Sequence, residues 1–474
     1  MMAIMAAALL TASCARQQLS VEDLRVEHMQ NPSVVDATQP RLSWINTPKS
    51  QTARGLKQTA YRIVVATSMK KLQQSNYDLW DSGRQESDAS SLVAYQGKPL
   101  PSAQDCYWKV QTWDQDGKPS AWSKPARWGM GLLDAADWKA QWIAPSLDHA
   151  GAPLLRKQFD THGKVKQAKV FVCGLGYFEL YVNGQRIGDD YLVPNMTDYT
   201  ERHDLDKGPI AIAGNMSGHR VMYLAYDVTK QLQKGRNALG VLLGNGFYDA
   251  LNLNIPLSHF GEKCLRLQLQ LTYTDGTTQT VCTDGTWQTK PSAITYNSVH
   301  GGEIYNANLE TPLWATTRDN SEGWQNVKTI EGPKAEMSAH TAPTDRIVET
   351  MKPISLIRRE DGAWVVDFGK EISGWIHFRD LKGTKGDTLK VDYMSESVQG
   401  NMRYVMNGSG NEEYAPRFTW FAFSKAVITG IDQLTTKNLT ADVVNTDVAR
   451  AADFHTTDTL FNRINEIWQR SQLD

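Results

Sequence analysis

The sequence predicts a mainly β protein built from tandem β-sandwiches and ending in a helical segment. Helical periodicity is sparse before residue 455, apolar and polar residues alternate over many short runs, and two-residue turn signals separate those runs. The Asp-Gly pairs begin at 116, 275, 284 and 361, and the Asn-Gly pairs at 183, 245 and 407. At 474 residues the chain is too long for one hydrophobic core, so we expect two to four domains.

The first predicted sandwich covers residues 21–133. Residues 61–66 and 106–113 read as strands, and the pair Asp116-Gly117 turns the chain after the second of them. This pattern resembles a fibronectin type III module. We expect the module to act as a spacer or to pack against its neighbours.

The second predicted sandwich covers residues 150–325 and contains the most informative stretch of the chain, AKVFVCGLGYFELYVNGQRIG at 168–188. The stretch reads as three antiparallel strands, with reversals at residues 174–176 and at the pair 183–184. In the middle strand the two faces alternate, with Phe178, Leu180 and Val182 on one and Tyr177, Glu179 and Tyr181 on the other. We expect a half-buried strand of a jelly-roll sandwich, with an aromatic and acidic outer face.

The third predicted sandwich covers residues 335–450, and a helix follows it at 455–474. We place the run GGEIYNA at 301–307 in the second sandwich, and the runs VVDFG, SGWI and YAPRFTW in the third. Thr457 or Asp458 is the expected N-cap of the helix. Its apolar residues recur at helical spacing and form one stripe, which consists of Leu460, Phe461, Ile464, Ile467 and Trp468.

Composition and motifs exclude several function classes. The net charge is −2 with both signs interspersed, which argues against nucleic acid or anionic membrane as a partner. The sequence lacks CxxC, HExxH, HxxxH and GxSxG patterns, so zinc chemistry and a serine nucleophile elbow are not indicated. Cys173, Cys264 and Cys282 occur in strand-like text and are expected to be small core residues. One disulfide among these three and Cys106 stays open.

The N-terminus reads as an export signal. Residues 1–10 are almost wholly apolar, and the run LTASC that follows resembles a lipobox. We expect residues 1–20 to be a signal peptide with lipobox and Cys14 to be the lipidated residue. The expected location is therefore the periplasm or the outer membrane of a Gram-negative-type bacterium, with a lipid anchor as the only membrane contact.

Seven segments occur in an order that resembles one family. They are QTAYRIVVA, YWKVQTWD, GLGYFELYVNG, YDVT, LGNGFYD, VDFGKEISGW and YAPRFTW. In this order they are similar to bacterial α-L-rhamnosidases of glycoside hydrolase family 78. The resemblance implies a fibronectin-like domain, a jelly-roll domain and a concanavalin-like sandwich, followed by an (α/α)6 barrel. It also implies rhamnose-containing oligosaccharides or polysaccharides as partners.

The resemblance implies that the catalytic acid and base belong to the barrel. We therefore expect no catalytic residue in this chain, and interpret 455–474 as the first helix of a truncated catalytic domain. Isolated carboxylates in strand or loop text are expected to be solvated or locally hydrogen-bonded, namely Glu303, Asp367, Glu371 and Glu396. The chain is then the non-catalytic N-terminal portion of an α-L-rhamnosidase. The alternatives are an exported carbohydrate-binding lipoprotein without hydrolase activity and a purely structural array of sandwiches.

Two loops of the second sandwich have the residue types that a sugar or calcium site needs. Carboxylate and amide oxygens suit a hard cation, and aromatic rings suit the apolar face of a sugar. Ordinary turn chemistry explains the same residues. No cofactor is expected apart from calcium at these loops. The candidate residues are Asp198, Tyr199 and Glu201 in one loop and Asn245, Tyr248 and Asp249 in the other.

We predict that Cys14 becomes the mature N-terminus and carries lipid, because small residues directly precede it at the end of the apolar run. Expression in a Gram-negative host with labelled fatty acid should label the wild-type chain and not Cys14→Ser. A wild-type chain that never acquires the label, or a Cys14→Ser chain that keeps it, would contradict lipidation at this residue.

Overall fold

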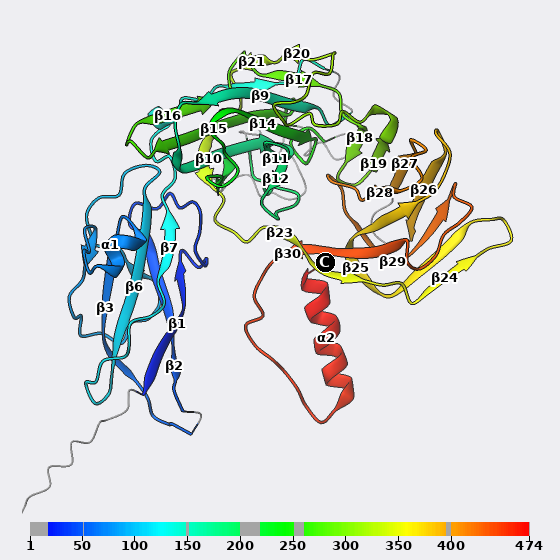
Figure 1. The fold of residues 1–474 in the computed structure, drawn as a ribbon. Coiled ribbons are helices and arrows are strands. Elements are labelled where there is room, and N and C mark those ends of the chain that lie inside the picture. The colour runs from blue at the N-terminus through cyan, green and yellow to red at the C-terminus, as the bar shows by residue number, and fades with distance from the viewer. Residues whose placement is uncertain are drawn as a thin grey trace, which may run out of the picture. The chain divides into compact units, whose positions relative to one another are not determined.

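The computed structural model describes residues 18–50, 52–147, 151–199, 219–250, 260–394 and 400–473. The signal segment with Cys14, the candidate residue Glu201 and the carboxylate Glu396 lie outside these ranges. The fold is mainly β, as predicted, with strands throughout and one long helix near the C-terminus (Figure 1). The chain divides into two compact units, Met1–Asp134 and Ala135–Asp474, which we describe separately.

Unit 1 is a sandwich of a three-stranded and a four-stranded sheet. The first sheet has the order β1 (Leu19–Val26), β2 (Arg41–Pro48) and β5 (Val93–Ala94). The second has the order β4 (Trp80–Asp81), β3 (Gln58–Ala66), β6 (Asp105–Asp114) and β7 (Ala126–Gly129). A short helix, α1 (Met69–Gln73), follows β3.

Buried aromatic residues fill the space between these two sheets. Trp44, Trp108 and Trp128 are almost fully buried in one core cluster with Tyr95. The indole N–H of Trp44 donates to the Gln58 side chain at 3.0 Å, so its polar atom is satisfied inside the core. The predicted turn after β6 forms because Asp114 Oδ1 accepts the backbone N–H groups of Asp116 and Lys118.

Unit 2 begins with two sheets that face each other across a common core. Apolar side chains of both sheets meet in that core, among them Val170, Leu180 and Leu269. The seven-stranded sheet contains β21 (Lys328–Ile330), β8 (Trp142–Ala144), β15 (Cys264–Tyr273), β10 (Val165–Leu175), β13 (Arg220–Asp227) and β22 (Glu336–Ala339), with β16 (Thr278–Cys282) on β15. The six-stranded sheet contains β12 (Gln185–Ile187), β11 (Tyr177–Val182), β14 (Gly235–Gly244), β9 (Leu154–Thr161), β17 (Gln288–Lys290) and β20 (Gln325–Asn326).

The stretch at 168–188 forms the three predicted strands β10, β11 and β12, but only the second reversal is a hairpin. Val182 pairs with Gln185 across Asn183 and Gly184, which both have positive φ, as a type I′ turn requires. At the first reversal the chain passes from the seven-stranded to the six-stranded sheet, so β10 and β11 are not hydrogen-bonded partners. The backbone of Asn245 lies so close to Gly176 that a Cβ there would be 1.8 Å from its carbonyl oxygen.

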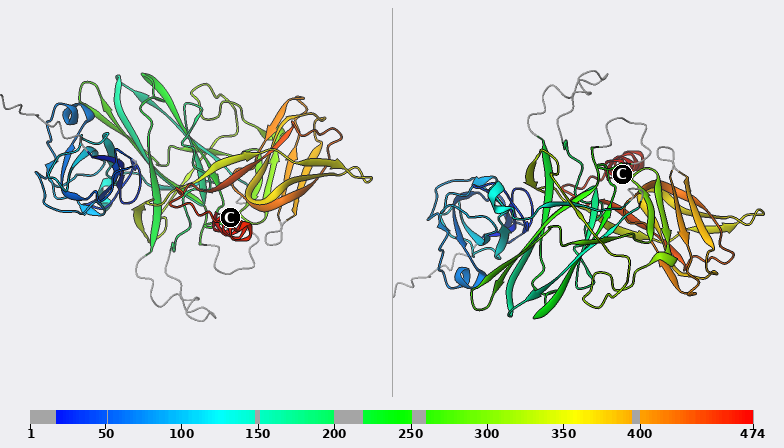
Figure 2. Two further views of the ribbon diagram at one scale, coloured as in Figure 1. Left: turned by 90° about the horizontal axis from the view of Figure 1, so that it is seen from below. Right: turned by 90° about the horizontal axis from the view of Figure 1, so that it is seen from above.

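A ten-stranded sheet and the C-terminal helix follow in unit 2. The long strand β25 (Trp364–Leu381) joins the predicted runs VVDFG and SGWI in one element, with a register shift between Asp367 and Ile372. The run at 301–307, expected in the second sandwich, contributes β19 (Gly302–Asn306), which pairs with β27 (Asn401–Val405) and extends this sheet. The hairpin of β24 (Ser355–Arg358) and β25 projects beyond the other strands (Figure 2). The strands are β18 (Ile294–Ser298), β19 (Gly302–Asn306), β27 (Asn401–Val405), β26 (Thr388–Met394), β29 (Phe421–Thr429), β25 (Trp364–Leu381), β30 (Leu439–Thr446) and β23 (Asp345–Met351), with β24 (Ser355–Arg358) and β28 (Glu412–Tyr414) on β25.

The cysteines of the described residues are all free thiols. Cys106, Cys173 and Cys264 are buried within strands, and Cys282 is half-buried. Burial raises the pKa of the Cys173 and Cys264 thiols well above its ordinary value. They therefore pack as small apolar residues, and the disulfide left open by the sequence does not form between them. Within the described ranges no helix is long and apolar enough to span a bilayer.

The C-terminal helix α2 (Thr459–Leu473) begins where the sequence predicts. Asp458, one of the two expected N-caps, accepts the backbone N–H of Leu460 at 2.8 Å. None of the residues of α2 is buried. The exposed fraction is 51–62% for every residue of the predicted apolar stripe: Leu460, Phe461, Ile464, Ile467 and Trp468.

We predict that this stripe promotes self-association of the isolated chain, because it exposes a contiguous apolar face to water. Ending the chain at Ala452, or replacing Phe461 and Trp468 by Ser, should raise the monomeric fraction in size-exclusion chromatography. The exposed polar residue Glu466 offers a matched control as Glu466→Ser, which should behave like the wild type. Equal elution of all four chains would contradict the prediction.

Candidate functional site

The loop residues expected to bind sugar or calcium are brought together only in part. Tyr199 and Tyr248 contact each other in a T-shaped pair with ring centroids 5.1 Å apart, and Phe260 packs against both. Tyr199 and Tyr248 are only 2% and 6% exposed, so these rings are core residues of the fold. Asp198 instead faces His219, with 3.2 Å between its Oδ2 and the histidine Nδ1.

Asn245 and Asp249 surround a buried ammonium group. Lys263 is fully buried and donates from Nζ to the Gly151 carbonyl at 2.8 Å and to Oδ1 of Asn245, and Asp249 Oδ2 lies 3.8 Å from Nζ. Burial lowers the pKa of Lys263 to about 8, although the Asp249 carboxylate opposes this shift. The backbone N–H of Asn245 also donates to Oδ1 of Asn297, and the side-chain amide of Asn245 donates to the Asn297 carbonyl.

The side-chain oxygens of Asn245 and Asp249, two of the residues expected to hold a cation, therefore already face the ammonium group of Lys263. The described residues contain no group of three or more His, Cys, Asp or Glu side chains suited to a metal ion. Glu201 belongs to the same predicted set but lies outside the described ranges. Binding of sugar or calcium at these loops stays a prediction.

A second cluster, whose members the sequence did not bring together, joins the six-stranded and ten-stranded sheets. Glu179 on β11 is only 6% exposed and receives hydrogen bonds from Arg417 at 2.6 Å and Arg186 at 3.2 Å. The Tyr181 hydroxyl donates to the same carboxylate at 2.7 Å. Burial alone raises the pKa of Glu179, but the two guanidinium groups outweigh it and hold that pKa below its usual range.

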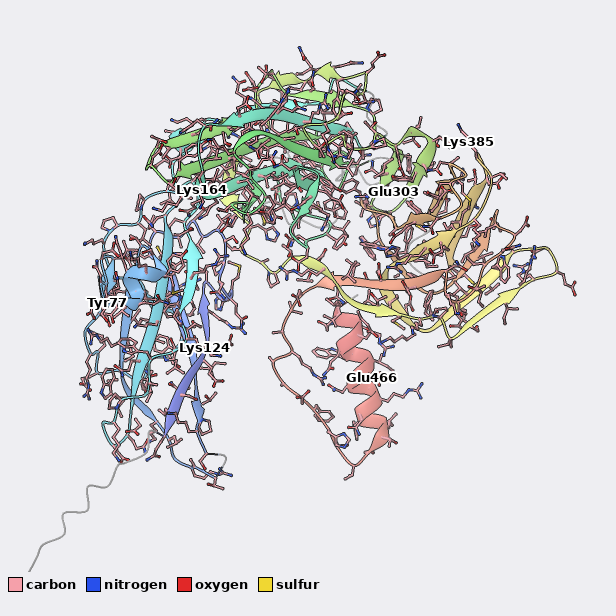
Figure 3. The ribbon with its side chains drawn as sticks, viewed as in Figure 1. Tyr77, Lys124, Lys164, Glu303, Lys385 and Glu466 are labelled. Atoms are coloured by element: carbon pink, nitrogen blue, oxygen red, sulfur yellow. The ribbon has the colours of Figure 1, made fainter. Side chains whose placement is uncertain are left out.

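Glu303 on β19 is the other carboxylate of this junction (Figure 3). It is fully buried and accepts hydrogen bonds from the Tyr414 hydroxyl at 3.2 Å and from the backbone N–H groups of Arg417 and Phe418 at 3.1 and 3.3 Å. Burial raises the pKa of Glu303 to about 7, which the hydrogen bonds only partly offset. Of the two expected environments, local hydrogen bonding is the correct one, and the solvated alternative was wrong for this residue.

Arg417 connects the two carboxylates, since its backbone bonds to Glu303 and its side chain to Glu179. It lies in the loop after β28, so most of the run YAPRFTW is not strand. The only local signal for this cluster is the position of Glu179 between Tyr177 and Tyr181, which places a carboxylate among bulky rings on one face of a strand.

The other carboxylates singled out by the sequence lie apart from this junction on β25. Asp367 accepts the backbone N–H of Gly369 at 2.7 Å and pairs with Lys425 at 3.1 Å, and these contacts hold its pKa below the usual range. Glu371 is exposed. Both residues fit the expected roles of local hydrogen bonding and solvated surface.

We predict that Glu303 makes the stability of the chain fall as pH rises from about 4.5 to about 7. The folded chain binds a proton at Glu303 that the unfolded chain has already released over this window, because its pKa is raised from 4.5 to about 7. Glu303→Gln mimics the protonated carboxyl and should remove the effect, which is worth about 2–3 kcal/mol between pH 5 and 8.

Denaturant unfolding at pH 5, 6, 7 and 8 measures this difference. The exposed residue Glu371 offers the matched control, since Glu371→Gln should follow the wild-type pH profile. Parallel profiles for Glu303→Gln and the wild type would show that the buried carboxyl is ionised throughout.

Comparison with known families gives three consecutive matches. The family model for a "Rha78A-like, N-terminal immunoglobulin domain" matches residues 21–134. The model for the "Alpha-L-rhamnosidase N-terminal domain" matches residues 163–208 and 216–349. The model for the "Bacterial alpha-L-rhamnosidase concanavalin-like domain" matches residues 357–445.

Curated relatives and solved structures agree with these matches. An α-L-rhamnosidase of Formosa agariphila is 30% identical over 98% of this chain and 52% of its own length, and one of Alteromonas sp. is 29% identical over 93% and 49%. The structure of an α-L-rhamnosidase from Dictyoglumus thermophilum superposes with a TM-score of 0.85 at 31% identity, over 96% of this chain and 52% of that one. At 22% identity, a Streptomyces avermitilis α-L-rhamnosidase complexed with L-rhamnose shares the fold, with a TM-score of 0.86 over 96% of this chain and 60% of that one.

The chain spans about half the length of the curated relatives that it matches. The three models follow one another in the order expected from the resemblance, and the structural match extends across both units. The chain therefore carries the three domains that these models describe, namely the immunoglobulin-like, N-terminal and concanavalin-like domains of bacterial α-L-rhamnosidases.

Proposed function

We propose that these β domains are the non-catalytic part of an α-L-rhamnosidase, an enzyme that hydrolyses terminal α-L-rhamnose from glycans with inversion. The observation that carries the proposal is the collinear match of three rhamnosidase domains along one chain. A single β-sandwich would support no activity, because one architecture serves many functions.

The environments of three carboxylates, Glu179, Glu303 and Asp367, support a non-catalytic role for these domains. An inverting glycosidase needs a carboxylic acid that protonates the leaving oxygen and a carboxylate that activates water, set roughly 6.5–9.5 Å apart and open to substrate. Glu303 is enclosed, Glu179 is held by two arginines, and Asp367 is paired with Lys425. These three carboxylates are therefore unsuited to the two roles, which supports our proposal that the acid and base lie outside the β domains.

The proposed substrates are rhamnose-containing oligosaccharides or polysaccharides. Two features support them, namely the rhamnosidase names of the relatives and the L-rhamnose in the Streptomyces avermitilis structure. We further propose export as a periplasmic or outer-membrane lipoprotein, for which the apolar N-terminal segment and Cys14 are the support.

We predict that purified residues 15–474 do not hydrolyse an aryl α-L-rhamnoside above a heat-killed control. Without a paired acid and base the glycosidic oxygen is not protonated and water is not activated, and binding energy from a sandwich surface does not replace them. The full-length Formosa agariphila relative serves as the positive control in the same assay.

Turnover proportional to protein would contradict this prediction if one carboxylate substitution within residues 15–474 abolished it. Glu310→Gln and Glu371→Gln are suitable substitutions, because both carboxylates are exposed and their replacement leaves the core intact. Such a result would place the chemistry within the β domains.

A further inference from the structure

Unit 2 contains a fully buried lysine beside an amide and a carboxylate, a group of side chains that the proposed function does not use. Lys263 directly precedes β15 of the seven-stranded sheet, whereas Asn245 directly follows β14 of the six-stranded sheet. Lys263 and Asn245 are 0% exposed, and Asp249 is 2% exposed. An amine, an amide and a carboxylate therefore meet in the interior, on segments that belong to two facing sheets.

The side chain of Asn245 is held with its carbonyl group toward Lys263. Its backbone N–H donates to Oδ1 of Asn297 at 2.7 Å, and its Nδ2 donates to the Asn297 backbone carbonyl at 2.8 Å. These bonds leave Oδ1 of Asn245 to accept a hydrogen bond from Nζ of Lys263. Since Oδ1 is bonded to Cγ, this contact holds the lysine nitrogen close to the electrophilic carbon of the amide, as an intramolecular reaction requires.

Asp249 contacts both of these residues. Its backbone N–H donates to the Asn245 backbone carbonyl at 3.1 Å. Its Oδ2 accepts the backbone N–H of Lys263 at 3.4 Å and lies 3.8 Å from Nζ. A carboxylate beside a nucleophile can take a proton from it and then return a proton to the leaving group.

The lysine is also in a suitable protonation state. Burial lowers the pKa of Lys263 to about 8. A substantial fraction of the chains therefore carries the neutral amine near pH 8, and the neutral amine is the nucleophilic form of a lysine.

We propose that Lys263 and Asn245 form an intramolecular isopeptide bond in the folded chain, with Asp249 transferring the proton. The lone pair of the neutral Nζ attacks Cγ of Asn245, and one Nζ proton passes to Asp249. Asp249 returns a proton to Nδ2, the Cγ–Nδ2 bond breaks with its electron pair on the nitrogen, and ammonia leaves. One amine and one primary amide thus give one secondary amide and one ammonia, so the reaction needs no oxidant, cofactor or second substrate.

The bond ties the six-stranded sheet covalently to the seven-stranded sheet. Disulfides usually supply such cross-links in secreted proteins, but the cysteines of the described part of the chain are free thiols. An isopeptide bond is an amide and is not cleaved by thiol reductants. The proposal concerns the maturation of the fold, and it does not depend on whether the chain serves hydrolysis.

Intact-mass spectrometry of purified residues 15–474 tests the bond. We expect a mass about 17 Da below the mass calculated from the sequence, which corresponds to the loss of one ammonia. Trypsin should not cut after Lys263, because the side chain is no longer a cation. Chymotrypsin should cut after Tyr248 and Phe260, and the two peptides that contain Asn245 and Lys263 should nevertheless stay joined.

Two variants and a matched control identify the reacting groups. Lys263→Met lacks the amine and should have the mass calculated from its own sequence. Asp249→Asn keeps both reacting side chains and should form the bond at least about a hundredfold more slowly, because the proton-transfer group is lost. Lys157→Met is the control, since Lys157 also contacts a carboxylate, that of Asp284 at 2.6 Å, and should keep the loss of ammonia.

These measurements also separate the bond from a succinimide at Asn245-Gly246, which would lose the same mass. A succinimide would persist in Lys263→Met, would let trypsin cut after Lys263, and would leave no joined peptides after chymotrypsin.

The proposal is overturned if the wild type has its calculated mass and is cut after Lys263, or if Lys263→Met keeps the loss of ammonia. A folded Asp249→Asn chain that cross-links as fast as the wild type would overturn the role of Asp249. The mass and peptide map of the wild type decide the central claim even if a variant fails to fold. Neither depends on the aryl rhamnoside assay, so this proposal and the proposed function fail separately.

Discussion

Unit 2 depends on how two buried carboxylates are compensated where its sandwiches meet. A carboxylate moved from water into a protein interior is costly unless charge or hydrogen bonds replace its solvation. Glu179 receives charge from Arg417 and Arg186, and Glu303 receives backbone N–H groups from the Arg417 loop. The Arg417 loop donates hydrogen bonds to one carboxylate of each sheet, Glu179 and Glu303. If the loop moved away, both carboxylates would lose the groups that replace their solvation. The two sheets are thereby coupled through hydrogen bonding as well as through apolar contact.

The local features of the fold could be predicted from sequence, because they depend on neighbouring residues. Asn183-Gly184 makes a tight turn by its own backbone preferences, and Asp458 caps a helix that starts one residue later. The alternation in β11 correctly placed Phe178, Leu180 and Val182 in the core. Strand pairing was beyond such reasoning, since the alternation of one strand carries no information about its partner. For that reason β10 and β11 were expected side by side but lie in different sheets.

In the candidate site, too, the sequence predicts local residue types but not the long-range contacts that decide their roles. Asn245 and Asp249 were chosen for their oxygens, but the ammonium group that these oxygens contact belongs to Lys263, which directly precedes β15. Glu303 appeared isolated because Tyr414 and Arg417 follow more than a hundred residues later. The outer face of β11 was expected to be half-exposed, yet Tyr177 and Glu179 are buried because a distant loop covers them. Contacts of such high sequence separation become visible only in three dimensions.

The free thiols have a consequence for how the chain folds in an oxidising compartment. Cys173 and Cys264 are on neighbouring strands of one sheet and stay reduced because the folded core shields them. An unfolded chain delivered across a membrane would present the same thiols, with ordinary reactivity, to disulfide-forming enzymes. Correct folding then requires β10 and β15 to pair before their cysteines are oxidised. A reducing cytosol would prevent that oxidation, so the compartment in which the protein is made should affect the yield of folded chain.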